Sequence, residues 1–292
     1  MPAMNGRPGC RGFTLVELAV ALVLGTVILS AACQVLLASQ RFFRLQSSVL
    51  EVHAGLRTAL QVLTAELREL DASGGDIVAL GSDSISIRAT RGIEFLCAPP
   101  NPSTGTVVVR SSLSSGYRDV DPARDRALVF RDGDPSSEDD DAWLDFGIAS
   151  AGASASCADG AAATELRLLG AVRSLDSVGP GAPVRWYERA VYRLYADETG
   201  AWWLGERHLS DGAWAPLSPI AGPLRRPSGL QLTYYDASGA ATADPSHVAR
   251  IDIAVRGVGS ALLQAMGGRQ GHWADSLATI VLLRNGKRGA LP

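Results

Sequence analysis

The sequence predicts an α+β protein, in which one long N-terminal helix packs on a mainly antiparallel β-sheet. Two observations lead to this prediction. The apolar residues are concentrated near the N-terminus, where residues 18–40 contain no charged side chain. The rest of the 292-residue chain consists of short alternating runs bounded by Gly, Pro, Ser and Asp, as in strands and turns. With 31 Gly, 15 Pro and 6% aromatic residues, the body is expected to be loop-rich and not a helical bundle.

The composition excludes some broad classes of protein. Hydrophobic residues make up 47% of the chain and charged residues 20%, which excludes global disorder. The 27 basic and 30 acidic residues give a net charge of −3. Proteins that hold nucleic-acid phosphates usually show a basic excess. The overall charge therefore gives no support for nucleic-acid binding.

The uncharged segment is long enough to cross a membrane. Its 23 positions, 18–40, exceed the roughly 20 apolar residues that a spanning helix needs. Arg7 and Arg11 precede it, and residues 1–12 contain no acid. This asymmetry favours a cytoplasmic N-terminus and a body on the other side of the membrane.

Three interpretations of this segment compete. It is a signal peptide cleaved near 30–32, a lipoprotein signal with Cys33 as the lipidated residue, or an anchor that is retained while residues 1–12 are removed. Glu17 favours the third interpretation, because a carboxylate inside a membrane costs roughly 2.5–3.5 kcal/mol and marks a functional residue that needs a partner. A cation supplied by another chain is the expected partner. The alternative is that Glu17 is an interfacial residue of an ordinary anchor.

The residues from Gly12 to Glu17 carry a resemblance. A basic leader, Gly12, an aromatic Phe13, Glu17 four positions later and about 20 apolar residues together resemble the class III signal of type IV pilins and type II secretion pseudopilins. The resemblance implies that prepilin peptidase cleaves between Gly12 and Phe13 and N-methylates Phe13. It also implies that Glu17 pairs with the Phe13 amine of a neighbouring subunit during filament assembly.

The helix is expected to continue beyond the membrane. Apolar residues follow at spacings of three and four, which indicates one stripe on a helix. They are Leu45, Val49, Val52, Leu56, Leu60, Leu63, Leu67 and Leu70. The stripe ends before the Gly-containing segment 71–75, so an unbroken helix over 13–71 would be about 88 Å long. We expect the stripe to pack on the sheet; an independent coiled-coil stalk is the alternative.

Residues 72–292 are expected to form the β-rich body. The runs that read as strands are 77–80, 84–89, 93–97, 106–110, 127–131, 165–172, 185–195, 201–209, 230–235, 248–256 and 276–283. Residues 147–164 are interpreted as a linker, and Ser260–Met266 as a candidate short helix. A body of this size after such a helix resembles a large minor pilin of the PilW type or a minor pseudopilin of the J type.

Two of the four cysteines are expected to form a disulfide. Cys10 would leave with the leader and Cys33 would lie in the membrane, so Cys97 and Cys157 are the candidate pair in an oxidising periplasm. A bridge across the intervening 60 residues would stabilise the fold by ~3–4.5 kcal/mol. Two free thiols are the alternative.

No motif predicts catalysis, a cofactor or a metal. The four histidines do not form a zinc pattern, and no nucleophile elbow or phosphate-binding loop is present. The acidic run 132–141 fails the EF-hand pattern and is interpreted as a solvated loop, with a calcium site as the alternative. Trp202, Trp203 and Trp214 are interpreted as core or sheet-face residues, with an exposed partner patch as the alternative.

The sequence therefore predicts a structural assembly subunit, not an enzyme. Its leader (1–12) is removed, residues 13–40 span the inner membrane and later the filament core, residues 41–71 continue the helix, and 72–292 form a periplasmic body. The expected partners are prepilin peptidase, other major and minor pilins or pseudopilins, and the inner-membrane assembly platform. DNA would be a partner only of a DNA-uptake pilus. The alternative function is a membrane-anchored periplasmic enzyme or ligand-binding domain.

Overall fold

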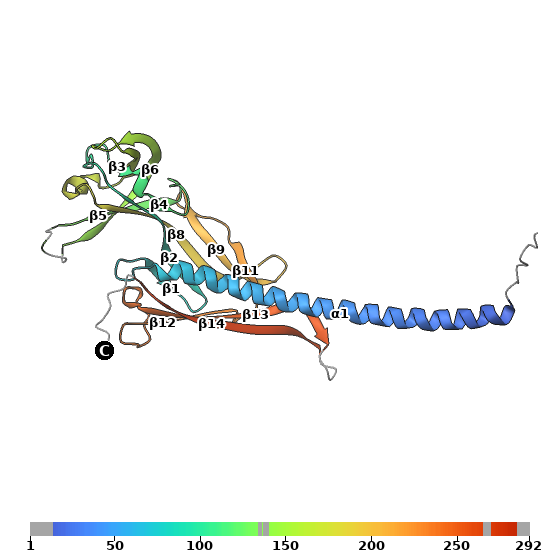
Figure 1. Ribbon diagram of the computed structural model, residues 1–292. Helices are drawn as coiled ribbons and strands as arrows, with labels where there is room; N and C mark the ends of the chain where they lie inside the picture. The colour runs from blue at the N-terminus through green and yellow to red at the C-terminus, as the bar shows by residue number, and fades with distance from the viewer. Residues whose placement is uncertain (1–13, 134–135, 137–139, 265–269, 285–292) are drawn as a thin grey trace, which may run out of the picture.

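A computed structural model describes residues 14–133, 136, 140–264 and 270–284. In this part of the chain, one long helix, α1 (Leu15–Arg68), precedes a 14-stranded sheet and three short 3₁₀ turns. Figure 1 shows α1 running along the β body with its C-terminal part and projecting far beyond the body with its N-terminal part. The predicted α+β architecture is confirmed.

Helix α1 is slightly shorter than the expected span of 13–71. Its 54 residues correspond to about 81 Å. Thr14 caps its N-terminus, and Glu69 is the C-cap residue. The chain then turns away, because Asp71 accepts hydrogen bonds from Ser73 Oγ (2.7 Å) and the Gly74 N–H (2.9 Å), and Gly75 adopts a φ of 80°. Such a φ suits glycine, which has no Cβ.

The C-terminal half of α1 docks on the sheet through the predicted stripe. Its buried residues are Ser48, Val52, Gly55, Leu56, Ala59, Leu63 and Leu67. They face β11 (Ser218–Leu224), β13 (Arg250–Gln264) and β14 (Gln270–Leu282). A Cβ on Gly55 would lie 2.6 Å from the Gly222 carbonyl oxygen, so glycine allows the backbones of α1 and β11 to approach closely. The coiled-coil stalk interpretation is therefore wrong, because the stripe is covered by the protein's own sheet.

The body is one continuous antiparallel sheet. The main path runs β12-β13-β11-β9-β8-β5-β6-β7-β3, with β14 beside β13, β10 beside β9, and β2 beside β8, β1 and β4. The remaining strands are β1 (Ile77–Leu80), β2 (Ser84–Phe95), β3 (Thr106–Arg110), β4 (Ser115–Gly116), β5 (Asp125–Arg131), β6 (Ala142–Ser156), β7 (Ala162–Leu169), β8 (Pro183–Ala196), β9 (Trp202–Ser210), β10 (Ala213–Trp214) and β12 (Leu230–Tyr235). The 3₁₀ turns are Ser111–Leu113, Val172–Ser177 and Pro245–His247.

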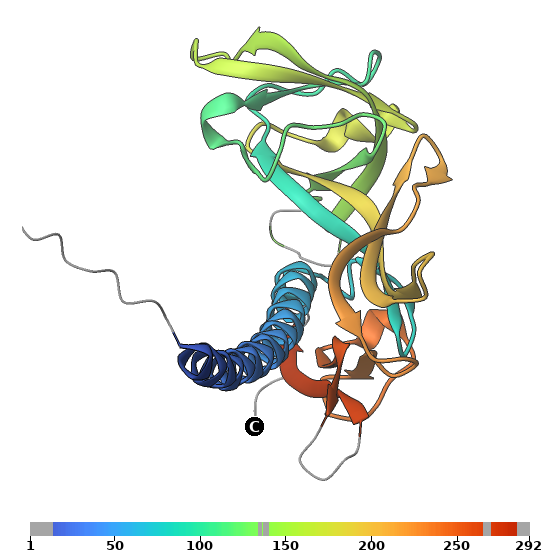
Figure 2. The ribbon, with the colours of Figure 1, turned by 90° about the vertical axis from the view of Figure 1, so that its right-hand side faces the viewer.

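The sheet bends around two separate hydrophobic cores. The first lies under α1 and combines its stripe with the inner faces of β2, β8, β12 and β13. The second lies away from the helix, between β3, β5, β6, β7 and the start of β8, and includes Phe146 and Trp186. Figure 2 shows the corresponding two parts, the strands next to α1 and a curled upper part. The long strands β2 and β8 run through both parts and join them.

Two local predictions are wrong. Residues 147–164 are not a linker, because β6 extends to Ser156 and pairs with β7 down to Ser156↔Ala162. The small Gly, Ala and Ser side chains have weak strand preference, but backbone pairing with β7 overrides it. Ser260–Gln264 continues β13 and is not a helix, while residues 265–269 lie outside the described residues. Strand β11 was not predicted, because Pro219 and Pro223 interrupt its pattern and its pairing is irregular.

Candidate functional site

The candidate site begins just before the described part of the chain. Gly12 and Phe13, the expected cleavage and methylation residues, lie outside the described residues, as does Cys10. The structure starts at Thr14 and leads directly into α1. Among the residues expected to act in processing and assembly, Glu17 is therefore the one whose surroundings the structure describes.

Glu17 forms a capping box with Thr14. The Thr14 backbone N–H donates to Glu17 Oε2 (2.9 Å), and the Thr14 hydroxyl lies 3.1 Å from the same oxygen. In return, the Glu17 N–H donates to Thr14 Oγ1 (3.2 Å). This arrangement satisfies N–H groups at the helix start and holds a negative charge where the helix dipole favours it. This local role of Glu17 was not among the predictions, although the spacing Thr-x-x-Glu signals it.

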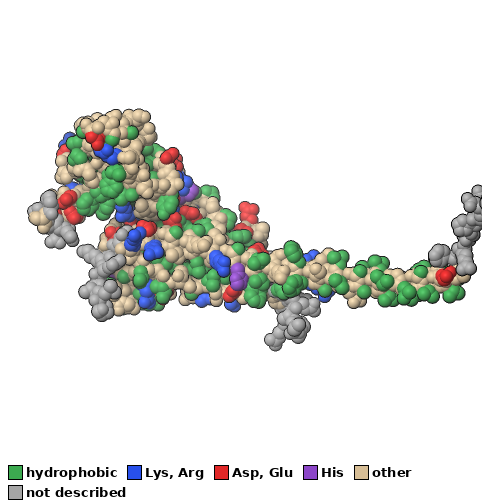
Figure 3. Space-filling model, in the orientation of Figure 1, with side chains coloured by type: hydrophobic (Ala, Val, Ile, Leu, Met, Phe, Trp, Pro, Cys, Tyr) green, Lys and Arg blue, Asp and Glu red, His purple; other side chains and the backbone are tan. Residues whose placement is uncertain are grey.

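The half of α1 that follows Glu17 is covered by nothing in the described chain. Every residue from 14 to 44 is exposed, including Leu15 (85%) and Ile28 (70%). Figure 3 shows hydrophobic side chains along the whole projecting segment. In the described residues, α1 is the one helix that is long and apolar enough to cross a membrane. An apolar surface of this size requires lipid or other subunits around it.

Two polar side chains in this segment are already satisfied within the helix. Thr26 Oγ1 donates to the Val23 carbonyl and Ser30 Oγ to the Val27 carbonyl, each at 2.8 Å. Hydroxyl groups bonded in this way are compatible with an apolar environment. The exposed Cys33 carries a free thiol and lies on the same segment.

An ion-pair network ties the other end of α1 to the body. Arg91 on β2 donates to both carboxylate oxygens of Glu66 on α1 (2.9 and 3.0 Å) and to Glu188 on β8 (2.6 Å). Arg124 donates to the other carboxylate oxygen of Glu188 (2.6 Å). Burial alone would raise the pKa of Glu188, but Arg91 and then Arg124 lower it below its usual value. For Glu66, burial dominates and raises the pKa. The network fixes the orientation of the helix on the sheet.

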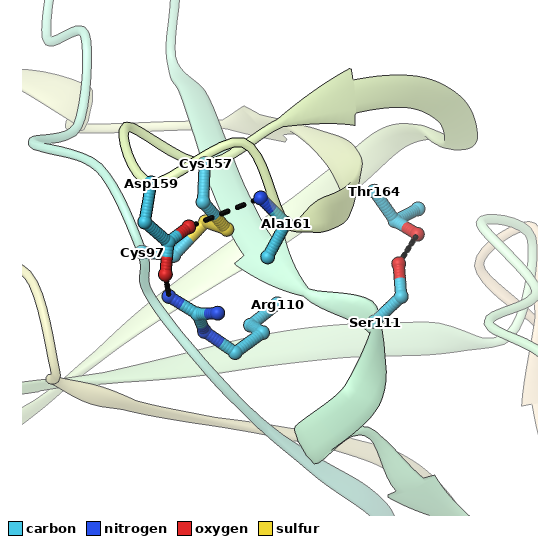
Figure 4. Close-up of a disulfide and its surroundings, with 7 residues drawn as sticks. All are labelled: Cys97, Arg110, Ser111, Cys157, Asp159, Ala161 and Thr164. Carbon is cyan, nitrogen blue, oxygen red and sulfur yellow. Dashed lines mark hydrogen bonds and ion pairs between the residues drawn. A yellow bond between two sulfur atoms is a disulfide. The ribbon is translucent and has the colours of Figure 1, made fainter.

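A disulfide joins Cys97 and Cys157, as the sequence analysis expected. Cys157 is buried and stands at the turn between β6 and β7, while Cys97 follows β2. Figure 4 shows Asp159 beside the bridge, where it accepts from Arg110 Nη2 (2.6 Å) and from the Ala161 N–H (3.1 Å). These contacts anchor the turn that carries Cys157, and the free-thiol alternative is wrong for these two residues.

In the part of the chain that the structure describes, the other singled-out residues are not brought together into a recognisable catalytic site. Within the described ranges, no three His, Cys, Asp or Glu residues are placed to hold a metal ion. Part of the acidic run, 134–135 and 137–139, lies outside those ranges. Trp202 packs against the helix-side core and Trp203 Nε1 donates to Asp197 (2.8 Å), whereas Trp214 is 36% exposed.

One comparison with known proteins bears on the anchor. Residues 7–32 match the family model of the prokaryotic N-terminal methylation motif. The motif supports a type IV pilin-like protein. The motif therefore supports a processed, pilin- or pseudopilin-like subunit with one N-terminal membrane-anchoring helix, and it implies processing by prepilin peptidase and assembly with other pilins. No curated protein and no solved structure matches the chain.

Proposed function

We propose that the protein is a minor pilin of the PilW type or a minor pseudopilin of the J type. Prepilin peptidase removes residues 1–12 and methylates Phe13, and the subunit enters a type IV pilus or a type II secretion pseudopilus. The observation that carries this proposal is the matched motif at residues 7–32, followed by an apolar half-helix that the body leaves uncovered.

Before assembly, the subunit is anchored in the inner membrane. Residues 13–40 span the bilayer with the N-terminus in the cytoplasm, residues 41–71 carry the helix onto the sheet, and residues 72–292 form a periplasmic body. Its partners there are the inner-membrane assembly platform and other major and minor pilins or pseudopilins. The large two-core body suits a place in the tip or initiation complex, where no further subunit has to stack on it.

During assembly, the Phe13 amine of a neighbouring subunit approaches Glu17. Glu17 Oε2 is occupied by Thr14, whereas Oε1 accepts no hydrogen bond within the described chain, so one oxygen remains for an incoming cation. A charge pair in a low-dielectric core gains several kcal/mol by gross attraction, but desolvation offsets most of it. The pair therefore sets the register of the helices more than it adds net affinity.

Two substitutions at Glu17 separate the capping role from the charge. Glu17→Gln keeps an oxygen that can cap Thr14 but loses the charge, and Glu17→Ala loses both. We expect both variants to insert into the membrane and both to be incorporated about tenfold less, a difference of about 1.4 kcal/mol. Glu198→Gln, the same change on the exposed surface of the body, is the matched control.

The readouts are the mass of the mature N-terminus and the amount of subunit recovered with sheared filaments. The wild-type chain should begin with N-methylated Phe13. Incorporation of Glu17→Gln at the wild-type level would refute the pairing role. A mature chain that still begins at Met1, or that begins beyond residue 32, would refute the proposed function as a whole.

A further inference from the structure

The face of the sheet turned away from α1 concentrates arginine and aromatic side chains. Residues 184–195 on β8 alternate between two faces. Val184, Trp186, Ala190, Tyr192 and Leu194 point into the cores. The opposite face carries Arg185, Tyr187, Arg189, Val191, Arg193 and Tyr195.

Neighbouring strands extend this arginine face. Arg88 on β2 is the register partner of Arg189, and Arg207 on β9 is the register partner of Val191. Arg88, Arg189, Arg193 and Arg207 therefore lie together across three adjacent strands, β2, β8 and β9, which Figure 1 shows side by side. We call these four residues the arginine cluster. Adjacent strands are about 4.8 Å apart, so the cluster is roughly 10 Å wide.

None of the four guanidinium groups has a carboxylate partner among the described residues. Their two neighbours on the same face do have one: Arg126 pairs with Asp145 (2.9 Å) and Arg185 with Asp76 (2.9 Å). Like charges directly opposite each other on adjacent strands, as at Arg88 and Arg189, destabilise a sheet. Four unneutralised arginines thus present a concentrated positive surface on a chain whose net charge is −3.

Aromatic rings hold three of the four guanidinium groups in place. Arg189 and Arg207 both stack on the Trp214 ring, at 5.8 and 4.9 Å from its centroid, and Arg88 lies 5.4 Å from the centroid of Tyr187. The Nε atoms of Arg189 and Arg207 are buried without a hydrogen-bond partner, so their terminal amino groups are the donors left for a ligand. A planar donor fork that is fixed in this way suits bidentate recognition of an anion.

We propose that the arginine cluster binds a carboxylate-rich surface of a neighbouring subunit. This inference rests on the proposed function, because the partner is another subunit of the assembly. A short cluster of Asp and Glu side chains fits a positive surface about 10 Å wide. A nucleic acid, which carries charge along its whole length, would be expected to use a longer positive surface than this cluster offers.

The test measures binding of short peptides to the full-length, detergent-solubilised protein by fluorescence anisotropy. The probe is a labelled octapeptide in which glutamate and serine alternate. Its control replaces each glutamate by glutamine. The wild-type protein should bind the glutamate peptide at low salt, should lose it as salt is raised, and should not bind the glutamine peptide.

Three double variants assign the binding to the cluster. Arg189→Gln with Arg207→Gln should weaken binding about tenfold or more, because both forks are lost. Arg189→Lys with Arg207→Lys should fall in between, because lysine keeps the charge without the fork. Arg173→Gln with Arg225→Gln, two exposed arginines elsewhere, should change binding less than twofold. Should the cluster glutamine variant unfold, as judged by its thermal midpoint, the lysine variant carries the test and must bind less tightly than wild type.

Several outcomes would overturn the proposal. These are equal binding of the two peptides, peptide binding that survives both cluster variants, and tighter cluster-dependent binding of a 20-nucleotide oligothymidylate, which would assign the face to nucleic acid. Absent peptide binding with normal Phe13 methylation and incorporation would refute this inference and leave the proposed function intact. Unprocessed Phe13 with normal peptide binding would do the reverse.

Discussion

Replacing one buried leucine of α1 by alanine should cost far more stability than replacing an exposed one. Leu63 is 0% exposed in the core beneath the helix, and Leu50 is 69% exposed on the same helix. The two substitutions change helix propensity equally, so their difference reports docking on the sheet. A buried Leu→Ala change costs about 2–5 kcal/mol, because apolar contact is lost and a cavity remains. An exposed one usually changes stability by at most about 0.5 kcal/mol.

The measurement is urea unfolding of the full-length protein in detergent, followed by tryptophan fluorescence. Trp202 packs against the helix-side core and so reports on the docked state. A domain of ordinary stability has about 5–15 kcal/mol in total, so the Leu63→Ala midpoint should fall clearly below those of wild type and Leu50→Ala. Equal midpoints for the two variants would refute docking of α1 through this stripe.

Three further predictions concern processing, the disulfide and pH. Gly12→Leu should block leader removal and leave a larger chain on a denaturing gel, whereas Gly9→Leu within the leader should be cleaved normally. Replacing Cys97 and Cys157 together by alanine should lower stability by about 3–4.5 kcal/mol, because a 60-residue loop is no longer closed in the unfolded chain; an unchanged urea midpoint would contradict this. Arg91 and Arg124 overcome burial and depress the folded-state pKa of Glu188 below 4.5, so its stabilising contribution is present above that pH and is lost as pH falls through the folded-state value. Glu188→Gln should flatten this acid dependence in urea titrations between pH 7 and 3, and an identical pH profile would contradict it.

The sequence was most informative where one periodic pattern determines the structure. The stripe from Val52 to Leu67 predicted both the helix and its packing, because side chains three and four residues apart must share one face. Strands Ile77–Leu80, Thr106–Arg110 and Leu230–Tyr235 were predicted with their observed bounds. Strand β6 was missed because much of its stability comes from pairing with β7, and composition alone does not show which strands pair.

The same limit applies to the sites. Glu17 is recognisable because its neighbours in sequence are also its neighbours in space. The arginine cluster combines the consecutive strands β8 and β9 with β2, whose Arg88 lies more than a hundred residues earlier in the chain, and an overall charge of −3 conceals it. The network around Arg91 joins Glu66 to Glu188 in the same non-local way. In both cases only the register of the strands reveals which charges meet.

The unbroken course of α1 has a mechanical consequence. No proline lies between Leu15 and Arg68, and the Glu66–Arg91 pair clamps the far end of the rod to the β body. The apolar N-terminal half of α1 and the β body are therefore rigidly connected and are expected to move together. If the N-terminal half of α1 shifts by one helical turn along neighbouring helices, the β body moves with it by about 5.4 Å. A one-turn misalignment of the helices would thus displace the whole β body by the same distance.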